Sequence, residues 1–259
     1  MLKAISCAKK NDRLGAEKIC VLVRCDLLPV SYMSPPEIRQ LRRVLRYRNL
    51  LVQQAVRLKN RIGGVLMECG EEYVKSRLHG KSYFYQLLDG LEHTPASAIE
   101  LLAISRGMLE TFQDLERRLL KGLKRHPLLA ERVELLRSIR GVGEVTALTW
   151  ALEVGEAERF GSISRAVSYC GLCAAQRESA GNQQRRPLSK QRNKHLQRVL
   201  VEAAKLAPRF NLELREVHER ELLRGSRNRA TLAVARKLVA YQLAVDRSRK
   251  PFAPRAGAA

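Results

Sequence analysis

The chain has 259 residues, of which 48 are Lys or Arg and 26 are Asp or Glu, so its net charge is +22. A charge of this size indicates a polyanionic partner, with nucleic acid ahead of an acidic membrane surface, although a solvated basic surface without a ligand is the plain alternative. Because no uncharged apolar run approaches a membrane span and residues 1–10 carry no apolar signal core, we expect an intracellular protein with no membrane partner.

Six cysteines in a chain of this length without a signal sequence favour reduced thiols over a disulfide framework. They are Cys7, Cys20, Cys25, Cys69, Cys170 and Cys173. The last two form a C-x-x-C, which is half of a zinc site, but the next candidate ligand, His195, has no second partner at a suitable spacing. Small buried thiols are therefore the better interpretation of this pair.

The N-terminal part of the chain predicts one short helix around Arg13 to Arg24, followed by a breaker region from Leu27 to Met33. The sequence Ser34-Pro35-Pro36-Glu37 then has the features of a helix start. It offers a capping Ser, prolines suited to the first turn and a capping-box Glu.

A long helical pattern follows this start. Apolar residues keep a helical spacing from Ile38 to Leu66, and no Pro interrupts the segment until well past Arg77, although Gly63-Gly64 could bend it. The pattern is about 40 residues long. Such a length favours a coiled-coil arm over a globular helix. Thr94-Pro95 is expected to cap a second long helix that reaches about Lys124. With a loop from Gly80 to His93 between them, the two helices predict an antiparallel hairpin, packed on itself or on a second subunit.

After Pro127 the pattern changes to short apolar helices separated by glycines, which is typical of a compact domain. Strand-like alternation is scarce, although the segment from Leu172 to Leu188 could form a short hairpin. The sequence therefore predicts a mainly α protein. We expect a long antiparallel coiled-coil helical hairpin at 34–126, a compact helical domain with a helix-hairpin-helix-like element at 127–252, and a disordered tail at 253–259.

The first motif of the compact domain is LRSIRGVGEVTA at 136–147, in which one helix ends and another opens after two glycines. This is the helix-hairpin-helix pattern, where backbone N–H groups at the second helix face a phosphate and glycine permits the close approach. An ordinary helix corner with glycine caps is the alternative. Together with the charge, the motif predicts contact with a nucleic-acid backbone through Arg140, Gly141 and Gly143.

A basic loop follows from residue 177 to residue 194, with six cations against the single acid Glu178. The cations are Arg177, Arg185, Arg186, Lys190, Arg192 and Lys194. A loop this polar and basic between apolar helices predicts a surface that binds phosphates. Ser189 is expected to cap the helix after it. Ser179 lies among small residues, where a lone Ser is ordinarily a hydrogen-bonding turn residue, and no His is placed to activate it.

Two further features complete the charge pattern. A basic stripe surrounds the last helix, whose apolar face is core; it consists of Arg224, Arg227, Arg229, Arg236 and Lys237. Near the N-terminus only Asp12 and Glu17 are acidic, whereas a metal-dependent nuclease needs several carboxylates around Mg²⁺. Taken alone, Asp12 is a helix cap.

The order of these residues resembles a known family. The matching segments are LRSIRGVG at 136–143, Phe160, YCGL at 169–172, SAG at 179–181, LSKQRN at 188–193 and the basic-apolar helix at 230–237. They are similar to the C-terminal domain of the IS110 family of insertion-sequence transposases (IS116/IS110/IS902 type), over about residues 130–252. RYRN at 46–49 and KNR at 59–61 are similar to the coiled-coil region of that family.

The resemblance implies DNA transposition by strand cleavage and exchange, with DNA as the partner and a structured guide RNA in some members. It also implies an N-terminal RuvC-like domain whose four acidic residues (DEDD) bind Mg²⁺, and a serine nucleophile. By position Ser179 matches the serine and Asp12 matches the first acid of a D-x-x-D, but Gly15 stands where its second acid is expected.

The resemblance therefore interprets residues 1–33 as a remnant of the RuvC-like domain. We expect an N-terminally truncated bacterial protein, cytoplasmic and nucleoid-associated, that binds DNA and forms homo-oligomers through the coiled coil. With Asp12 as the one matching ligand, this chain is expected to bind no Mg²⁺ itself and to lack catalysis.

Two other function classes stay open from the sequence. One is a non-catalytic helical DNA-binding module that contacts phosphates and cuts nothing. The other is a coiled-coil interaction protein, whose partner is a second copy or an intact transposase. Both share the basic surface and the long hairpin, so these two features alone do not separate them from a transposase.

Overall fold

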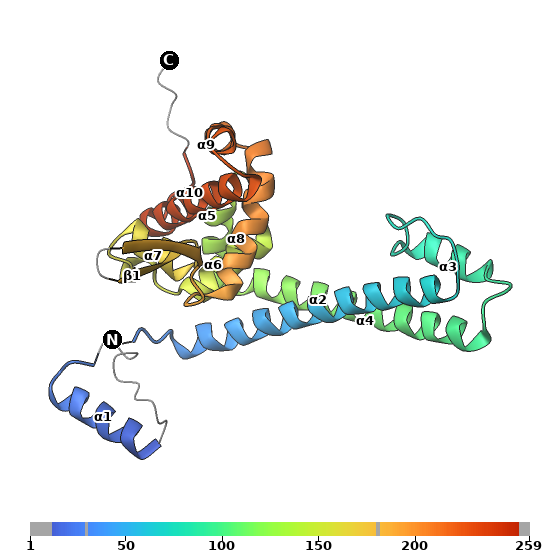
Figure 1. Ribbon diagram of the computed structural model, residues 1–259, viewed down its shortest axis with the longest axis horizontal. Coiled ribbons are helices and arrows are strands. Elements are labelled where there is room, and N and C mark those ends of the chain that lie inside the picture. The colour runs from blue at the N-terminus through green and yellow to red at the C-terminus, as the bar shows by residue number, and fades with distance from the viewer. Residues whose placement is uncertain (1–11, 29–30, 180–181, 254–259) are drawn as a thin grey trace. The chain divides into compact units, whose positions relative to one another are not determined.

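The computed structural model describes residues 12–28, 31–179 and 182–253, and its internal contacts divide the chain into two units between Pro35 and Pro36. The first unit contains helix α1 (Asp12–Arg24), at the place predicted for it. All other described elements belong to the second unit (Figure 1). The predicted mainly α class is confirmed, since the described strands form only one two-stranded sheet. Within the described ranges, no helix combines the length and hydropathy that a membrane span requires.

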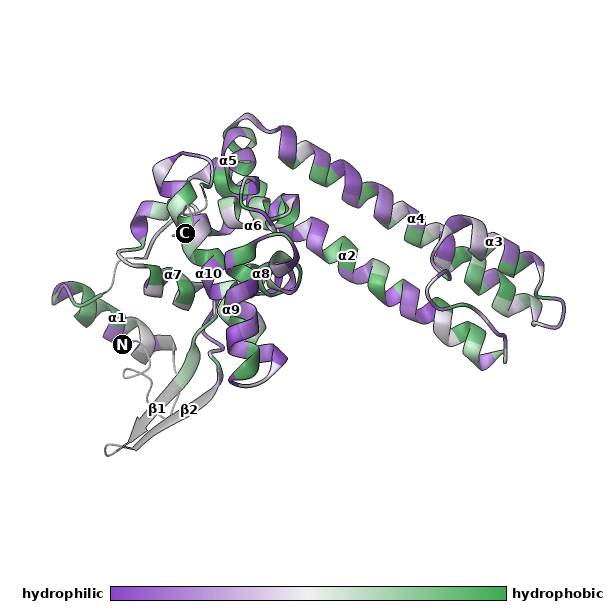
Figure 2. Cartoon of the chain, turned by 90° about the horizontal axis from the view of Figure 1, so that it is seen from above, coloured by the Kyte–Doolittle hydropathy of each residue, from purple (hydrophilic) through white to green (hydrophobic). Residues whose placement is uncertain are grey.

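Two long helices, α2 (Pro36–Glu68) and α4 (Ala96–Arg125), lie side by side and run in opposite directions (Figure 1). Hydrophilic and hydrophobic residues alternate along both helices (Figure 2), which is the pattern that buries one stripe of each. The facing stripes include Leu51, Ala55, Ile62, Leu66, Ala98, Leu102 and Leu109. The predicted antiparallel hairpin is therefore present in the second unit.

Helix α2 is shorter than predicted. It continues through Gly63 and Gly64 and ends at Glu68, not near Arg77. The cause is Gly70, whose φ of +74° ends the helix in a Schellman arrangement. In this arrangement the Gly70 N–H donates to Met67 O over 3.1 Å and the Glu71 N–H donates to Leu66 O over 3.0 Å.

The connection between the long helices is not a simple loop, because it contains helix α3 (Lys81–Asp89). Phe84 of α3 is buried in a core shared with α2 and α4. Thr94 does not cap α4 as expected; its hydroxyl donates a hydrogen bond to the Glu71 carboxylate. Buried Arg106 of α4 donates to His79 O and to the Glu110 carboxylate, at 3.0 and 2.9 Å, and so ties the connection to the hairpin.

The compact part of the second unit is built around α6 (Glu144–Val154), in which every residue from Thr146 to Val154 is buried. A helix that is apolar on all sides must be covered on all sides. Its cover comes from α5 (Pro127–Arg137), α8 (Lys194–Leu206) and the first part of α2, with further contacts from α4. The chain also forms 3₁₀ turn η2 (Ala157–Arg159), α7 (Ile163–Tyr169), 3₁₀ turn η3 (Ala207–Arg209), α9 (Leu212–Leu223) and α10 (Arg227–Ser248).

A buried ion pair joins α5 to α10 beside α6. The Arg132 guanidinium donates to both carboxylate oxygens of Asp246, at 2.7 and 2.6 Å, and the indole N–H of Trp150 donates to the same carboxylate at 2.9 Å. Arg132 also donates to the Ala151 and Gly155 carbonyl oxygens, which the end of α6 leaves without helical partners. The pair therefore fixes the C-terminal end of α6.

The predicted strand hairpin is present as β1 (Ala174–Ser179) and β2 (Asn182–Leu188), paired antiparallel. Ser189 is not the cap of the next helix, contrary to the prediction. Helix α8 begins at Lys194, and the Asn193 side-chain oxygen accepts hydrogen bonds from the backbone N–H groups of His195 and Leu196 at 3.0 and 3.2 Å. Asn193 therefore caps α8.

The turn between α5 and α6 packs against η3. Gly141 has a φ of +99°, and a Cβ added to it would lie 2.6 Å from the Cβ of Ala207. Gly143, the residue before α6, has extended backbone and nothing within 4 Å of the corresponding position. Gly141 is therefore required by both backbone conformation and packing, whereas Gly143 is not.

We expect Gly141→Ala to lower the free energy of unfolding by about 2 kcal/mol or more, because it adds backbone strain to a clash with Ala207. Gly143→Ala, which has room for its methyl group, should change stability by less than about 0.5 kcal/mol. Urea unfolding of both variants checks this. Equal stabilities would contradict the packing of this turn.

Candidate nucleic-acid interface

The candidate site is organised by Glu153, a carboxylate on α6 whose side chain is only 1% exposed. Arg46 of α2 binds it with two parallel hydrogen bonds, Nε to Oε1 and Nη2 to Oε2, each 2.8 Å long. The amide of Asn193 donates to Oε2 over another 2.8 Å. A buried carboxylate needs such partners to remain charged. Glu153 therefore joins α2 to the first residue before α8.

The backbone around Glu153 is held in the same way. The Tyr169 hydroxyl of α7 donates to the Glu153 carbonyl oxygen over 2.9 Å, and Arg42 of α2 donates to the Leu152 carbonyl oxygen over 2.8 Å. These carbonyls belong to the last turn of α6, which has no helical donors for them. Together the contacts fasten α2, α7 and the start of α8 onto one end of α6.

The electrostatic balance at Glu153 follows from these contacts. Burial by itself raises the pKa of Glu153. The hydrogen bonds from Arg46 and Asn193 and the nearby positive charges outweigh this, so that the pKa lies below its ordinary value. The same ion pair raises the pKa of Arg46. Glu153 is therefore negatively charged at neutral pH, beneath a cationic surface.

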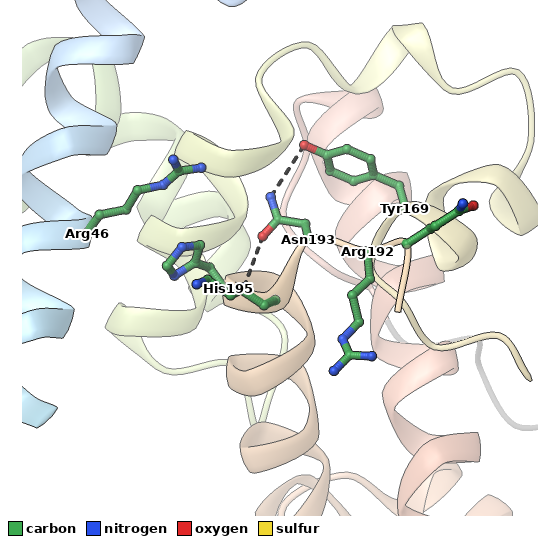
Figure 3. Close-up of a pocket in the computed structure, with 7 residues that line it drawn as sticks. Arg46, Tyr169, Arg192, Asn193 and His195 are labelled. Atoms are coloured by element: carbon green, nitrogen blue, oxygen red, sulfur yellow. Dashed lines mark hydrogen bonds between the residues drawn. The ribbon is translucent and has the colours of Figure 1, made fainter. Parts of the chain in front are cut away.

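Two adjoining hollows lie over this network, between α2 and the first turns of α8. Figure 3 shows the residues that line the first of them. The first, about 580 Å³, is lined by Arg46, Tyr169, Gln191, Arg192, Asn193, Lys194 and His195. The second, about 440 Å³, is lined on α2 by Arg48, Asn49, Val52 and Gln53 and elsewhere by Val145, Thr146, Lys194, His195, Arg198, Val199 and Glu202. Because Lys194 and His195 line both, the two hollows form one groove, which we call the α2–α8 groove.

The α2–α8 groove carries uncompensated positive charge. Arg46 is paired with Glu153 and Arg48 with Glu116, but within the described side chains neither Lys194 nor Arg198 carries an ion pair. Lys194 and Arg198 are four residues apart on α8 and therefore share a face. Both are exposed at the groove, as a polyanion would require.

His195 is half-buried and lines both hollows of the groove; Figure 3 shows it between Arg46 and Asn193. Burial lowers the pKa of His195, and the charges of Arg46, Lys194 and Arg198 lower it further, against the opposing effect of Glu153. The imidazole is therefore neutral at pH 7 and able to both donate and accept a hydrogen bond.

The structure brings together only some of the residues singled out from the sequence. Arg192 and Lys194 line the α2–α8 groove, and Lys190 is exposed in the segment before α8. Arg140 is exposed at the α5–α6 turn beside Gly141. At another place Arg236 of α10 donates from Nε to the Leu172 carbonyl oxygen over 2.8 Å, so part of its guanidinium supports the loop before β1.

Several predicted site residues lie outside the described side chains. The backbone of Ser179 ends β1 and pairs with Asn182 of β2, and the backbones of Arg177, Arg185 and Arg186 belong to the same hairpin. Their side chains, like that of Asp12 at the start of α1, are outside the described residues. The roles predicted for them therefore stay predictions.

The structure adds residues that motif reasoning missed. Glu153 is the main one; its signal is a single acid inside the apolar segment ALTWALEV at 147–154. A carboxylate in such a segment requires a buried cationic partner, which is a reason to look for one. Arg198 could have been found from its spacing of four residues after Lys194. Apart from its place in the segment RYRN, no sequence feature indicated that Arg48 would line the groove.

Metal binding has little support among the described residues, where no three His, Cys, Asp or Glu side chains come together. Gly15, one helical turn after Asp12, has no side chain to offer to an ion. The described residues therefore do not fit the Mg²⁺ site that the resemblance implies. Cys170 and Cys173 are free thiols, and burial raises the pKa of Cys170 to about 12, which makes it an unreactive core residue.

Comparison with known proteins finds relatives of the part of the chain that includes the α8 wall of this groove. Residues 133–219 match the model of the Transposase IS116/IS110/IS902 family. The transposase for insertion sequence element IS1111A of Coxiella burnetii is 27% identical over 247 residues, which cover 89% of this chain and 65% of that protein. The transposase for insertion sequence element IS1328 of Yersinia enterocolitica is 25% identical over 205 residues, 77% of this chain and 59% of that protein.

A protein of Sinorhizobium fredii named as a transposase is 26% identical over 195 residues, 75% of this chain. That alignment covers 47% of the relative, so the chain spans about half to two thirds of the length of the relatives it matches. The resemblance drawn from the sequence is confirmed: residues 133–219, which include α6, α7 and α8, match the model of this transposase family.

We expect Glu153→Ala to lower the free energy of unfolding by about 3 kcal/mol, because it leaves the Asn193 amide and the Arg46 guanidinium without their acceptor and opens a cavity. This is at the low end for a buried pair, since the Arg46 side chain is 48% exposed and can reach water. Glu202→Ala, which removes an exposed acid of α8, should cost less than about 0.5 kcal/mol.

The pKa of Glu153 also predicts a pH dependence. Because its folded pKa lies below the unfolded value of about 4.3, its stabilising effect is present above that pH and is lost as the pH falls through the folded pKa. The Glu153→Gln variant should therefore lose less stability between pH 5 and pH 3 than the natural chain. Parallel acid unfolding curves would show that Glu153 is not the charged centre described here.

Proposed function

We propose that this member of the insertion-sequence transposase family binds DNA through its phosphate backbone, along the α2–α8 groove. One observation supports the proposal most directly. Lys194 and Arg198 line the groove side by side, neither forms an ion pair with another described side chain, and Arg192 lines it from the preceding loop. Unpaired cations in a row are the residue types that displace counterions from a polyanion.

The other lining groups suit phosphate contact without base reading. Asn49, Gln53 and Gln191 offer neutral amide donors, and His195 offers a ring N–H. The predicted phosphate contact of the α5–α6 turn, through Arg140 and the N–H groups at the start of α6, adds to this surface. RNA phosphates present the same charge, so a guide RNA, which the resemblance implies for some family members, is an alternative ligand of the same chemistry.

Binding to a fluorescent DNA duplex at increasing salt tests this proposal. Each phosphate contact contributes about 0.9 to the slope of log affinity against log salt concentration. We expect the double variant Lys194→Ala/Arg198→Ala to reduce that slope by about 2. A matched double variant on α4, Arg117→Ala/Arg118→Ala, removes two exposed cations and should leave the slope within about 0.5 of the natural value.

Equal slopes in both double variants would show that the charge acts diffusely and that the groove is not the binding site. A slope near zero for the natural chain would contradict nucleic-acid binding by charge altogether.

Strand cleavage and exchange through a serine nucleophile form the second part of the proposal. Ser179 is the candidate nucleophile because it matches the serine of the family by position; it is the last residue of β1 in the basic hairpin β1–β2. Gly15 stands where the resemblance requires an acid, which supports the view that these 259 residues by themselves bind DNA without cleaving it. They then act as a binding module or as a partner of a catalytic transposase.

A nicking assay on supercoiled DNA with Mg²⁺ tests this part. We expect the purified chain to leave the DNA uncut, because one carboxylate cannot hold an octahedral Mg²⁺. DNA cleavage by the natural chain that Ser179→Ala abolishes would contradict the expectation and would establish the serine as nucleophile.

Homo-oligomer formation is the third part, and an apolar stripe on α4 supports it. Leu101, Ile104, Met108 and Leu115 are 39–52% exposed and lie on one face of α4, away from the face packed on α2. Their spacings of three, four and seven residues are those of a coiled-coil seam. A second copy of the chain, which carries the same stripe, is the occupant we propose.

We expect Ile104→Glu to weaken self-association about tenfold or more, because pairing would bury an unpaired carboxylate in the seam. Sedimentation equilibrium measures this directly. Lys121→Glu, on an exposed face of the same helix outside the stripe, serves as the control. If the two variants and the natural chain have the same mass, the stripe is not a self-association surface.

A further inference from the structure

The corner between α9 and α10 stands apart from the α2–α8 groove and has no role in the function proposed above. Eight consecutive residues, 222–229, are all exposed there. The corner nevertheless has a defined shape, because α9 packs along α10 and the Ser226 hydroxyl caps α10 by accepting from the Arg229 N–H. Arg229 Nε also donates to the Glu221 carboxylate over 2.9 Å. These contacts order the corner although its residues are exposed.

Leu223 at this corner is the most exposed large apolar side chain of the described residues, at 90%. Its neighbour Leu222 is 43% exposed. A leucine at this exposure contributes almost nothing to the core, and each Å² of it that a partner covers would gain about 25 cal/mol. Leu223 would therefore be more stable covered by a partner than exposed to water.

The charge around Leu223 indicates what kind of partner it fits. Four arginines lie in the same stretch of chain: Arg220, Arg224, Arg227 and Arg229. Glu221 pairs with two of them, Arg224 at 3.7 Å and Arg229 at 2.9 Å, and leaves the corner positive. An apolar side chain between arginines is the arrangement with which proteins enter a nucleic-acid groove, where the apolar group contacts bases and the cations bind the flanking phosphates.

We propose that the α9–α10 corner is a second nucleic-acid contact, in which Leu223 inserts beside the bases and Arg224 and Arg227 bind phosphates on either side of it. This rests on the proposed function only in taking nucleic acid as the ligand. The two sites differ in chemistry: the groove binds phosphates by charge, whereas the corner adds an apolar, salt-independent contribution. A protein partner for Leu223 is the competing occupant.

The test uses the full chain and a DNA duplex that carries 2-aminopurine, whose fluorescence rises when a base is unstacked. We expect Leu223→Ala to weaken binding about tenfold, the effect of one lost base contact, without change in the salt slope, and to abolish the fluorescence rise. Arg227→Ala should reduce the salt slope by about 0.9. The matched control is Leu212→Ala, at the opposite end of α9 and 67% exposed, which should behave as the natural chain.

Each other outcome has a separate meaning. If Leu223→Ala and Leu212→Ala bind alike while the groove variants lose their salt slope, the corner is not a contact and the proposed function stands. If Leu223→Ala changes only the mass of the protein in solution, the corner contacts protein, and the inference is wrong. If the natural chain shows no salt-dependent binding at all, the proposed function fails and this inference fails with it.

Discussion

The buried carboxylate of Glu153 is the constraint on which the rest of the structure depends. It receives hydrogen bonds from Arg46 of α2 and from Asn193, the residue before α8, and so ties these two helices together directly. Hydrophobic packing could bring these helices together in several registers, since it has no direction. A bidentate arginine–carboxylate pair has one geometry, and Asn193 uses its amide for Glu153 and its oxygen to cap α8. One acid therefore fixes where a helix begins and what lies beside it.

Glu153 also reduces the charge repulsion within this basic surface, because it pairs with Arg46. Cations brought together by folding repel one another, and this repulsion opposes the compact state. Glu153 neutralises the charge of Arg46, and Glu116 neutralises that of Arg48, so both arginines line the α2 side of the groove as members of ion pairs. Lys194 and Arg198, which form no ion pair with the side chains that the structure describes, then line the groove, where a polyanion can bind them. Stability and binding thus use different arginines and lysines of the same surface.

Much of the fold could be predicted from the sequence, but the site could not. Helical spacing located both helices of the hairpin and α1, because an amphipathic stripe is a local property of the chain. Helix α3 was not predicted, because the glycines at its two ends, Gly80 and Gly90, suggested a loop. Its Phe84 is buried in a core formed with residues of α2 and α4, which are far from it in the sequence. Ser189 was the predicted cap of α8, and Asn193 is a residue type that caps helices equally well. Asn193 caps the helix in the structure, where its amide also binds Glu153, a residue 40 positions from Asn193 and 107 from Arg46 in the sequence.

The measurement that tests the account most directly is to map which residues contact phosphate. A DNA duplex with photoreactive groups on its phosphates, cross-linked to the full chain and analysed by mass spectrometry, reports the contacts without any mutation. We predict cross-links in residues 46–53 of α2 and 191–202 around the start of α8, on the two walls of the groove. Cross-links confined to the far end of the hairpin, residues 69–95, with none in these two segments, would contradict it.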